Sequence, residues 1–576
     1  MRRRRRILWA LGALLAGAVW AAAGVLMLAR AASDIRAGTA AINRARAHAE
    51  LVDLAAGTPV ADVRAAQASF ERAHGRATSP LLLPVRLVPV IGRQLESVAA
   101  LSGAASDVGQ VILDTMLQGQ QLLERTPTNH PERVALVQRL SAIAGDAGRR
   151  LDAVDLGPDI GLFGRLAEAR DQLSSELGGL HDQVERGSVG AAGVAEMLTG
   201  PRRYLVFAAN NAEMRAGSGM FLSVGELEID NLGLRLVNMR SVVDVPVPKG
   251  MVPMDGDLAD RWGWLAPNVE WRNLMSSPDF AENAELAARM WVAAGNRPVD
   301  GVLAIDPVGL QALLLATGPV TVEGRRIDAG NVVDELLHAQ YVRYASRPRS
   351  DRREELGQIA RAAFDALDTS SVPNLAKAMT AAAGGRHFMA WSSKPLQQAG
   401  WQALGVDGAL RPDSLLVSVL NRGGNKLDQF LQVAADLSFA PKGSDTEATL
   451  TVTLTNATPL KGEPAYVAGE DPNAGVPQNV YLGILSVNVP GQAYDLSIDD
   501  SDTYAVAGTD GPTRVVGLQL RVDHQTSRTA VVRFTLPGDR GSVRVEPSAR
   551  VPAITWTGPG GTWPDGAAFT IPFAPH

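Results

Sequence analysis

RYLVFAANNAEMRAGSG, residues 203–219, decides how the middle of this chain is interpreted. A short apolar run, residues 204–209, is followed within ten residues by two amides, a carboxylate, a guanidinium and two glycines. Such a run bounded by turn-forming residues is typical of a buried strand. Gly217 and Gly219 allow positive φ and expose backbone N–H groups, which can form an anion nest. We therefore expect an anion-binding loop at a strand end, with an ordinary polar turn as the alternative.

Each polar side chain of this stretch has a role in that hypothesis. The guanidinium of Arg215 can grip a phosphate or carboxylate through two parallel hydrogen bonds. Asn210 and Asn211 can hydrogen-bond sugar hydroxyls, and Glu213 can hold a cation or act as a base. In the alternative, Glu213 and Arg215 pair with each other.

Residues 201–430 alternate between short apolar runs and helical patterns. Strand patterns occupy residues 219–230, 232–243, 299–307 and 414–421, and helical patterns occupy residues 284–295, 329–345 and 351–367. Strands that alternate with helices imply an α/β domain in which helices cover a sheet.

The regions on either side have different patterns. Residues 431–576 alternate in a period of two and are rich in Thr and Val, which predicts a β-sandwich domain. Residues 30–200 are helical and predict a stalk or bundle, interrupted where Pro80, Pro84 and Pro89 forbid continuous helix. A partner-binding coiled coil is less favoured, because strict heptads do not persist.

The N-terminus predicts a membrane anchor. Residues 1–6 form a basic tail, and residues 7–29 carry no charge, although about 20 residues suffice to cross a bilayer. The arginines at 2–6 place the N-terminus in the cytoplasm, so we expect a single-pass cell-membrane protein with an extracytoplasmic body. A cleaved signal peptide is the alternative, but its apolar region is usually shorter.

Composition excludes several classes of protein. The 576 residues contain no cysteine, which excludes disulfides and thiolate chemistry. The net charge is −6 although five basic residues cluster at 2–6, so we expect no nucleic-acid partner. The histidines are scattered, and we interpret His338 and His387 as structural. We find neither an HExxH motif nor a GxSxG nucleophile elbow.

Three further stretches carry candidate ligand-binding side chains. YVRYASRPRSDRREELGQ, residues 341–358, places Arg343 and Arg353 around Asp351 at a predicted helix N-terminus, a natural phosphate site; a solvated charged face is the alternative. NRGGNKLD, residues 421–428, offers Asn421, Asn425 and Lys426 after a strand, and WRNLMSSPDF, residues 271–280, offers Arg272. For the last two stretches a surface loop is the favoured interpretation.

The order of these motifs resembles a known family. NNAEMRAGSGMFLSVGELEID, SSPDF, VDGVLAIDP, LLLATGPVTVEG and NRGGNKLD are similar to the family called domain of unknown function 4012 over roughly residues 80–428. That family occurs largely in actinobacterial envelope proteins with an N-terminal anchor.

A more distant likeness is to the LytR–CpsA–Psr phosphotransferases, which move glycopolymers from polyprenyl-pyrophosphate carriers to the cell wall with a divalent cation. VDGVLAIDPVGLQALLLATGPVTV resembles their middle segment, and residues 341–359 resemble their last helix pair. The likeness implies that Arg343, Asp351 and Arg353 contact pyrophosphate, and it aligns Arg215 and Arg240 with the first strand pair.

The chain departs from the phosphotransferase pattern at one position. The Asp of the Arg-x-Asp motif is missing, and Ser218 or Gly219 lies near its place. Glu213 or Asp244 is then the candidate ligand for Mg²⁺.

These observations predict a multidomain protein with an N-terminal transmembrane helix, a helical stalk, an α/β domain resembling LytR–CpsA–Psr and a C-terminal β-sandwich. We expect the protein to bind a polyprenyl-linked or phosphorylated envelope glycan. It would transfer that glycan to the cell wall or another acceptor in the phosphotransferase interpretation, with Arg215, Arg343 and Arg353 neutralising phosphate and Glu213 or Asp351 holding Mg²⁺ or taking a proton. The alternatives are a non-catalytic glycan- or protein-binding scaffold and, less favoured, a glycan hydrolase with paired carboxylates.

Overall fold

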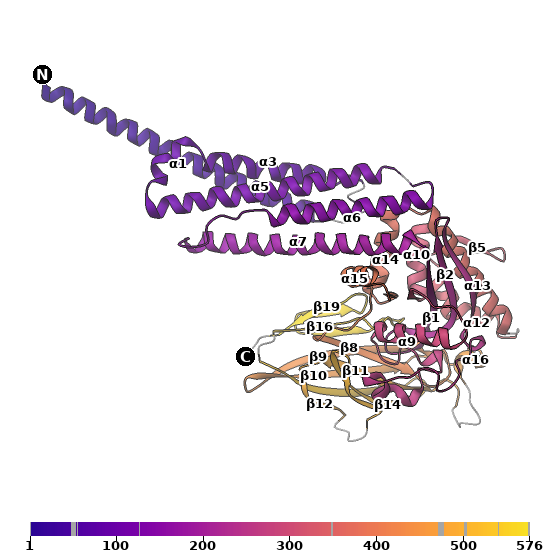
Figure 1. The fold of residues 1–576 in the computed structure, drawn as a ribbon. Helices are drawn as coiled ribbons and strands as arrows, with labels where there is room; N and C mark the ends of the chain where they lie inside the picture. Colours follow the sequence, from indigo (N-terminus) through magenta and orange to yellow (C-terminus); the bar gives the residue numbers. More distant parts are fainter. Residues whose placement is uncertain are drawn as a thin grey trace. The chain divides into compact units, whose positions relative to one another are not determined.

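The computed structural model describes residues 2–47, 53, 56–125, 127–346, 349–469, 477–499, 504–538 and 541–573; within these ranges, it leaves out the side chains of residues 2–19, 21, 349–354, 356, 368 and 369. The chain divides into two compact units (Figure 1). The first contains residues 1–127 and 135–192, and the second contains residues 128–134 and 193–576.

The first unit is helical. Its long helices run back and forth (Figure 1): α1 (Arg2–Arg46), α3 (Val60–Ala77), α5 (Pro89–Leu123), α6 (His130–Asp152) and α7 (Gly164–Thr199). Arg44 pairs with Asp62 and Arg76 pairs with Asp34, which makes α1 and α3 antiparallel. The predicted interruption is confirmed, because η1 (Pro80–Leu82) and α4 (Leu83–Arg86) separate α3 from α5, which begins at Pro89.

Among the described residues, no helix is both long enough and apolar enough to cross a membrane. Residues 7–19 and 21 of the predicted anchor lie outside the residues whose side chains are described. The anchor therefore stays a prediction.

The second unit begins with a mixed sheet in the order β3-β2-β1-β4-β7. Its strands are β1 (Arg202–Met214), β2 (Gly219–Asp230), β3 (Gly233–Ser241), β4 (Gly301–Ile305) and β7 (Phe388–Ser392). β1 and β4 are parallel, whereas the other neighbouring pairs are antiparallel.

Both faces of this sheet are covered, as β1 shows. Leu205 and Phe207 point to a core shared with α8 (Gly256–Trp262), η4 (Trp271–Asn273) and α9 (Phe280–Ala293). Tyr204 and Val206 point to the opposite core. That core is built with α10 (Pro307–Thr317), α13 (Arg349–Asp365), α14 (Val372–Gly384) and α15 (Pro395–Leu404). The prediction of a central α/β region is confirmed.

Shorter elements fill the connections. They are η2 (Val242–Asp244), η3 (Gly263–Leu265), β5 (Val320–Val322), β6 (Arg325–Ile327), α11 (Val332–Asp334), η5 (Glu335–Ala339), α12 (Gln340–Arg343), η6 (Ala366–Thr369), η7 (Leu427–Phe430) and α16 (Ala465–Ala468). η5 is a π-helical turn, so α11, η5 and α12 form one irregular helix.

The C-terminal region is β-rich, as predicted, and two sheets share one core. One sheet has the order β12-β15-β10-β9-β17-β18 and the other β13-β14-β11-β8-β16-β19. Their strands are β8 (Ser414–Asn421), β9 (Leu431–Lys442), β10 (Asp445–Asn456), β11 (Tyr481–Pro490), β12 (Tyr494–Ile498), β13 (Val506–Asp510), β14 (Thr513–Val522), β15 (Ser527–Leu536), β16 (Ser542–Val545), β17 (Thr555–Gly558), β18 (Gly561–Pro564) and β19 (Phe569–Pro572).

β8 differs from the expectation that residues 414–421 belong to the α/β domain. It pairs with β11 and β16 instead. Leu415, Val417 and Val419 face the core between the two C-terminal sheets, while Leu420 faces the α9 side of the α/β region. A strand buried on both faces lacks alternation, so its pattern could not show which sheet it joins.

Candidate functional site

The polar stretch that opens the α/β region is mostly strand rather than loop. β1 continues through Asn210 and ends at Met214, which pairs with Gly219 of β2 after an irregular register. The glycine prediction was wrong, because neither Gly217 nor Gly219 has a positive φ. Their role is close approach: a Cβ on Gly219 would overlap the Asn210 backbone, and one on Gly217 would overlap Met275.

Arg215 is buried at the tip of this hairpin and points into the protein. Its Nε donates to the Arg272 carbonyl at 2.8 Å, and its Nη1 donates to the carbonyls of Met214 and Asn421, both at 2.9 Å. Burial lowers the pKa of Arg215 to about 10, so it stays charged at neutral pH. Arg215 therefore ties the hairpin to β8 and η4.

Glu213 and Lys426 form a buried ion pair. The Lys426 ammonium also lies 5.5 Å from the ring centroid of Tyr341 and 5.1 Å from that of Tyr466. Burial lowers the pKa of Lys426 to about 7, although the charge of the Asp428 carboxylate acts in the opposite direction. Because the Glu213 carboxylate faces the Lys426 ammonium group, it does not fit the role of a magnesium ligand. The other proposed ligand, Asp244, is exposed in η2.

A second buried pair lies beside the first. Arg550 donates from Nη1 to Asp428 Oδ1 at 2.8 Å, and both side chains are 0% exposed. The same carboxylate accepts from Asn421 Nδ2 at 2.8 Å, from the Tyr481 hydroxyl at 2.9 Å and from the Met214 amide at 3.0 Å. We call Glu213, Arg215, Asn421, Lys426, Asp428 and Arg550 the junction cluster. It joins the β1–β2 hairpin to the C-terminal sheets.

Asn210 and Asn211 point to other polar groups. Asn210 Nδ2 donates to the Tyr341 hydroxyl at 2.6 Å, and Asn211 Nδ2 donates to Asp306 Oδ2 at 2.7 Å. The other oxygen of Asp306 accepts hydrogen bonds from the amides of Val308 and Gly309 and so caps α10.

His387 is a further partner of Asp306. Its Nδ1 lies 2.7 Å from Asp306 Oδ2. Burial lowers the pKa of His387, but the Asp306 carboxylate outweighs it, so the net pKa is raised.

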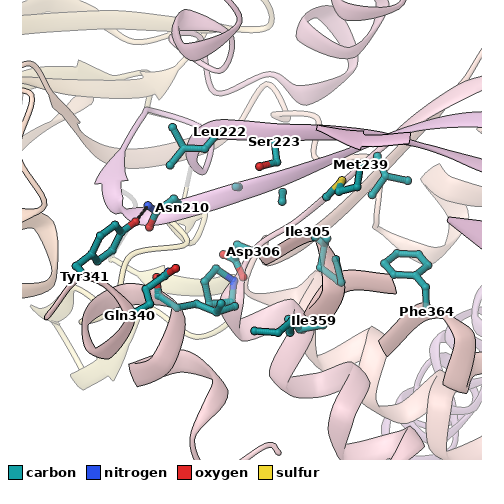
Figure 2. A pocket seen from close by; sticks show the side chains of 18 residues that line it. Asn210, Leu222, Ser223, Met239, Ile305, Asp306, Gln340, Tyr341, Ile359 and Phe364 are labelled. Carbon is teal, nitrogen blue, oxygen red and sulfur yellow. Dashed lines mark hydrogen bonds between the residues drawn. The ribbon is translucent and has the colours of Figure 1, made fainter. Parts of the chain in front are cut away.

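A cavity begins at this polar group and runs between the sheet and its helices. Its volume is about 740 Å³, including space open to solvent. In Figure 2, Asn210, Gln340 and Tyr341 lie at one end, and Met239 and Phe364 lie at the other. The lining is mainly apolar: Val206, Ala208, Ala209, Asn210, Leu222, Ser223, Met239, Ile305, Asp306, Pro307, Leu310, Leu336, Gln340, Tyr341, Gly357, Ile359, Ala360 and Phe364.

The π-helical turn η5 helps to form the cavity wall. It precedes Gln340 and Tyr341 and contains Leu336, and all three side chains line the cavity. Single π-helical turns occur often at functional sites, because the extra residue redirects the side chains that follow. The irregular turn thus leads directly into Gln340 and Tyr341 at the polar end of the cavity.

Arg343 is held in a network of charges on the helices beside the cavity. It lies 3.2 Å from Glu335 Oε2 and 3.1 Å from Glu355 Oε2, and Arg325 contacts the same two carboxylates. Hydrogen bonds to Glu335 raise the pKa of Arg343. The side chains of its predicted partners, Asp351 and Arg353, lie outside the described residues.

The remaining candidates are engaged elsewhere. Arg240 bonds Asn296 at 3.0 Å and lies 5.3 Å from the Trp291 ring centroid. Arg272 pairs with Glu270 at 2.6 Å, and Asn425 Nδ2 donates to the Val480 carbonyl at 3.1 Å. The predicted residues thus fall into several places. Among those whose side chains are described, only Asn210 lines the cavity.

Sequence reasoning missed the polar residues that lie at the cavity or beside it. Asp306 had a recognisable signal, because Asp-Pro after a strand is a typical helix start. Gln340 and Tyr341 had no such signal. Arg550 had none either, since its partner Asp428 lies 122 residues away in sequence.

Within the part of the chain that the structure describes, no group of three or more His, Asp and Glu side chains is placed to hold a metal ion. Magnesium binding stays a prediction.

Comparison with known proteins gives one match. Residues 199–341 match the model of a family described as a protein of unknown function, DUF4012. Neither a curated protein nor a solved structure matches the chain, and the likeness to LytR–CpsA–Psr enzymes stays a prediction. The matched segment runs from the start of the sheet to Tyr341 and includes the polar end of the cavity. The predicted likeness to the DUF4012 family is therefore confirmed over residues 199–341.

Proposed function

We propose that this protein holds a lipid-linked envelope glycan, of the polyprenyl-phosphate class, by the apolar chain of its lipid. The supporting observation is the cavity between the sheet and α13, which is apolar along most of its length and polar at one end. An amphiphile with a long hydrocarbon tail and a polar head is likewise apolar along most of its length and polar at one end.

The lining of the cavity suits this ligand class. Ligand sites are mostly apolar with a few placed polar groups, and the walls of this cavity have that composition. Each buried CH₂ contributes about 0.8 kcal/mol, so several isoprene units would supply substantial affinity without a charged contact. Asn210, Gln340 and Tyr341 would meet the polar part of the ligand.

The contacts of the basic residues favour retention over transfer. Arg215 bonds three carbonyls, Lys426 pairs with Glu213, and Arg343 is shared by two carboxylates. A phosphate would have to compete with these internal partners for the charges that a phosphotransferase needs. We therefore propose that the protein binds this ligand, and transfer stays a prediction. In this proposal the protein is anchored in the cell membrane with its body outside.

The proposal is tested by filling the cavity. Ala208→Phe on β1 and Ala360→Phe on α13 each place a ring inside it. Full-length protein would be purified in detergent, and lipids extracted from it would be identified and quantified by mass spectrometry against protein. We expect a polyprenyl-linked lipid with the unmodified chain and a loss of about tenfold or more in both variants, the effect of about 1.4 kcal/mol.

Ala288→Phe is the matched control. Ala288 lines a separate, more open cavity beside α9 with Val292 and Trp391, so the same substitution there should leave bound lipid unchanged. Equal lipid in all three variants, or none with the unmodified chain, would contradict the proposal and favour a glycan- or protein-binding scaffold. Thermal melting of each variant would show that the fold is retained.

A further inference from the structure

The turn between α3 and α5 is unusually apolar for an exposed segment. We call residues 79–91, SPLLLPVRLVPVI, the tip segment. Its exposed side chains include Leu83, Leu87, Val90 and Ile91, and Leu87 is 82% exposed. Leu82 alone among its leucines is buried, in a small core with Ala77, Leu95 and Ala99. Isolated exposed apolar residues are ordinary, but a continuous group marks an interaction surface.

Other apolar side chains lie at the same end of the helical unit. The connection between α6 and α7 exposes Ile160 and Phe163. It is tied to the start of α5, because Gln94 Nε2 donates to the Gly161 carbonyl at 2.9 Å and the Phe163 amide donates to Gln94 Oε1 at 2.8 Å. Figure 1 shows both connections at one end of the helices. The apolar surface is thus shared by two turns.

The tip segment also lies against the apolar part of α1. Trp20 Nε1 donates to the Leu81 carbonyl at 2.9 Å, and a Cβ placed on Gly24 would lie 3.5 Å from Leu82 Cδ2. Both α1 positions fall within the uncharged residues 7–29. The tip segment therefore contacts α1 within the predicted anchor.

These positions set the depth of the tip segment relative to a membrane. About 20 residues are needed to cross a bilayer, so an anchor that begins at residue 7 reaches the outer surface near residue 26. Trp20 would then lie about 9 Å inside that surface, at about 1.5 Å per residue. An anchor that ended before Trp20 would be too short to cross. The anchor and the tip segment therefore overlap in depth.

We propose that the tip segment inserts into the outer leaflet of the membrane that α1 crosses. The inference rests on the membrane anchor of the proposed function. A depth of about 5–10 Å is typical of interfacial segments, and Trp20 suits that level because Trp prefers the interface. Arg86, within the segment, is held by the Ala77 carbonyl, whereas Arg93, just after it, is exposed and can extend toward lipid phosphates.

The absence of cysteine allows a direct test. Leu87→Cys and, separately, Leu83→Cys would be labelled with the fluorophore NBD in the full-length protein. The protein would be reconstituted into phosphatidylcholine–phosphatidylglycerol vesicles. Quenching by doxyl-labelled lipid would be compared with quenching by aqueous iodide. We expect lipid quenching at both positions at least about threefold stronger than at the control, because the label would lie within the interface.

Leu232→Cys is the matched control, since Leu232 is a leucine that is also 82% exposed, in the turn between β2 and β3. Vesicle flotation is measured on the same samples. Protein that floats while both tip labels are quenched by iodide like the control would overturn this inference and leave the anchor intact. Protein that does not float would overturn both. Neither result would bear on lipid in the cavity.

Discussion

Lys426 lies in the interior beside Glu213, with the rings of Tyr341 and Tyr466 around its ammonium group. A buried pair of this kind adds little net stability over apolar residues, but the loss of one partner leaves the other charge without compensation. The pair therefore fixes the position of the β1–β2 hairpin more than it strengthens the fold. Asp428, close to Lys426 in sequence, forms a second buried pair with Arg550 from a distant segment.

At this scale we expect Lys426→Met to lower the free energy of unfolding by about 3–5 kcal/mol, because Glu213 would be left buried and unpaired. Glu213→Gln in the same chain should restore most of that loss. Urea unfolding of both single variants and the double variant gives the coupling free energy. If the two losses simply added, the side chains would not act as a pair.

The β1–β2 hairpin is the element on which the central region depends. Its tip contacts β8, η7 and the segment before β17: Ser418 Oγ donates to the Ala216 carbonyl at 3.0 Å, and Asn211 Nδ2 donates to the Ala549 carbonyl at 2.6 Å. The hairpin can reach these partners only if its strands close tightly at Gly219, where the Asn210 backbone leaves no room for a Cβ. The glycine therefore controls packing at the junction.

We expect Gly219→Ala to lower the free energy of unfolding by about 1–3 kcal/mol, because the added methyl group must displace backbone. Gly566→Ala is the control in the same unit, since a Cβ there meets no atom within 4 Å and Gly566 has no positive φ. Thermal and urea melts of both variants would be compared with the unmodified chain. Equal stability of the two variants would show that the close approach at Gly219 does not exist.

At the scale of the whole molecule, the second unit buries acidic side chains where the α/β region meets the C-terminal sheets. Ser277 Oγ donates to Asp510 Oδ1 at 3.0 Å, and Asp279 and Glu282 lie nearby at the start of α9. Burial, with the charge of Asp279, raises the pKa of Glu282 to about 7, and burial raises the pKa of Asp510 to about 6. Ionisation of these groups therefore opposes the folded state as pH rises.

The pKa of Glu282 is raised from 4.5 to about 7 by folding, so the folded state keeps the proton that the unfolded chain loses. Below pH 4.5 the carboxyl is protonated in both states and does not lower the free energy of unfolding. As pH rises from 4.5 to about 7, its ionisation lowers the free energy of unfolding progressively. We therefore expect Glu282→Gln to raise the melting temperature of the second unit at pH 8, by an amount that disappears as pH falls toward 4.5. Calorimetry across this pH range measures the difference. A difference independent of pH would mean that Glu282 ionises normally in the fold.

The sequence by itself determined the order of the regions and much of their local structure. Helical periodicity, alternation and the prolines at 80, 84 and 89 depend on neighbouring residues, so they could be interpreted without tertiary information. The same local signals placed β1, β2 and β4 and drew attention to Asn210, which lines the cavity.

Only the tertiary structure decided how the conspicuous side chains are used. Arg215, Lys426 and Arg343 are polar in sequence whether they meet a ligand or a partner inside the protein. Each has a partner in a distant segment or on another helix. Asn211 bonds a carbonyl 338 residues away, and β8 joins the sheet that its own pattern could not specify. The cavity likewise exists only where β1, η5 and α13 meet, because burial and charge pairing arise between segments rather than within them.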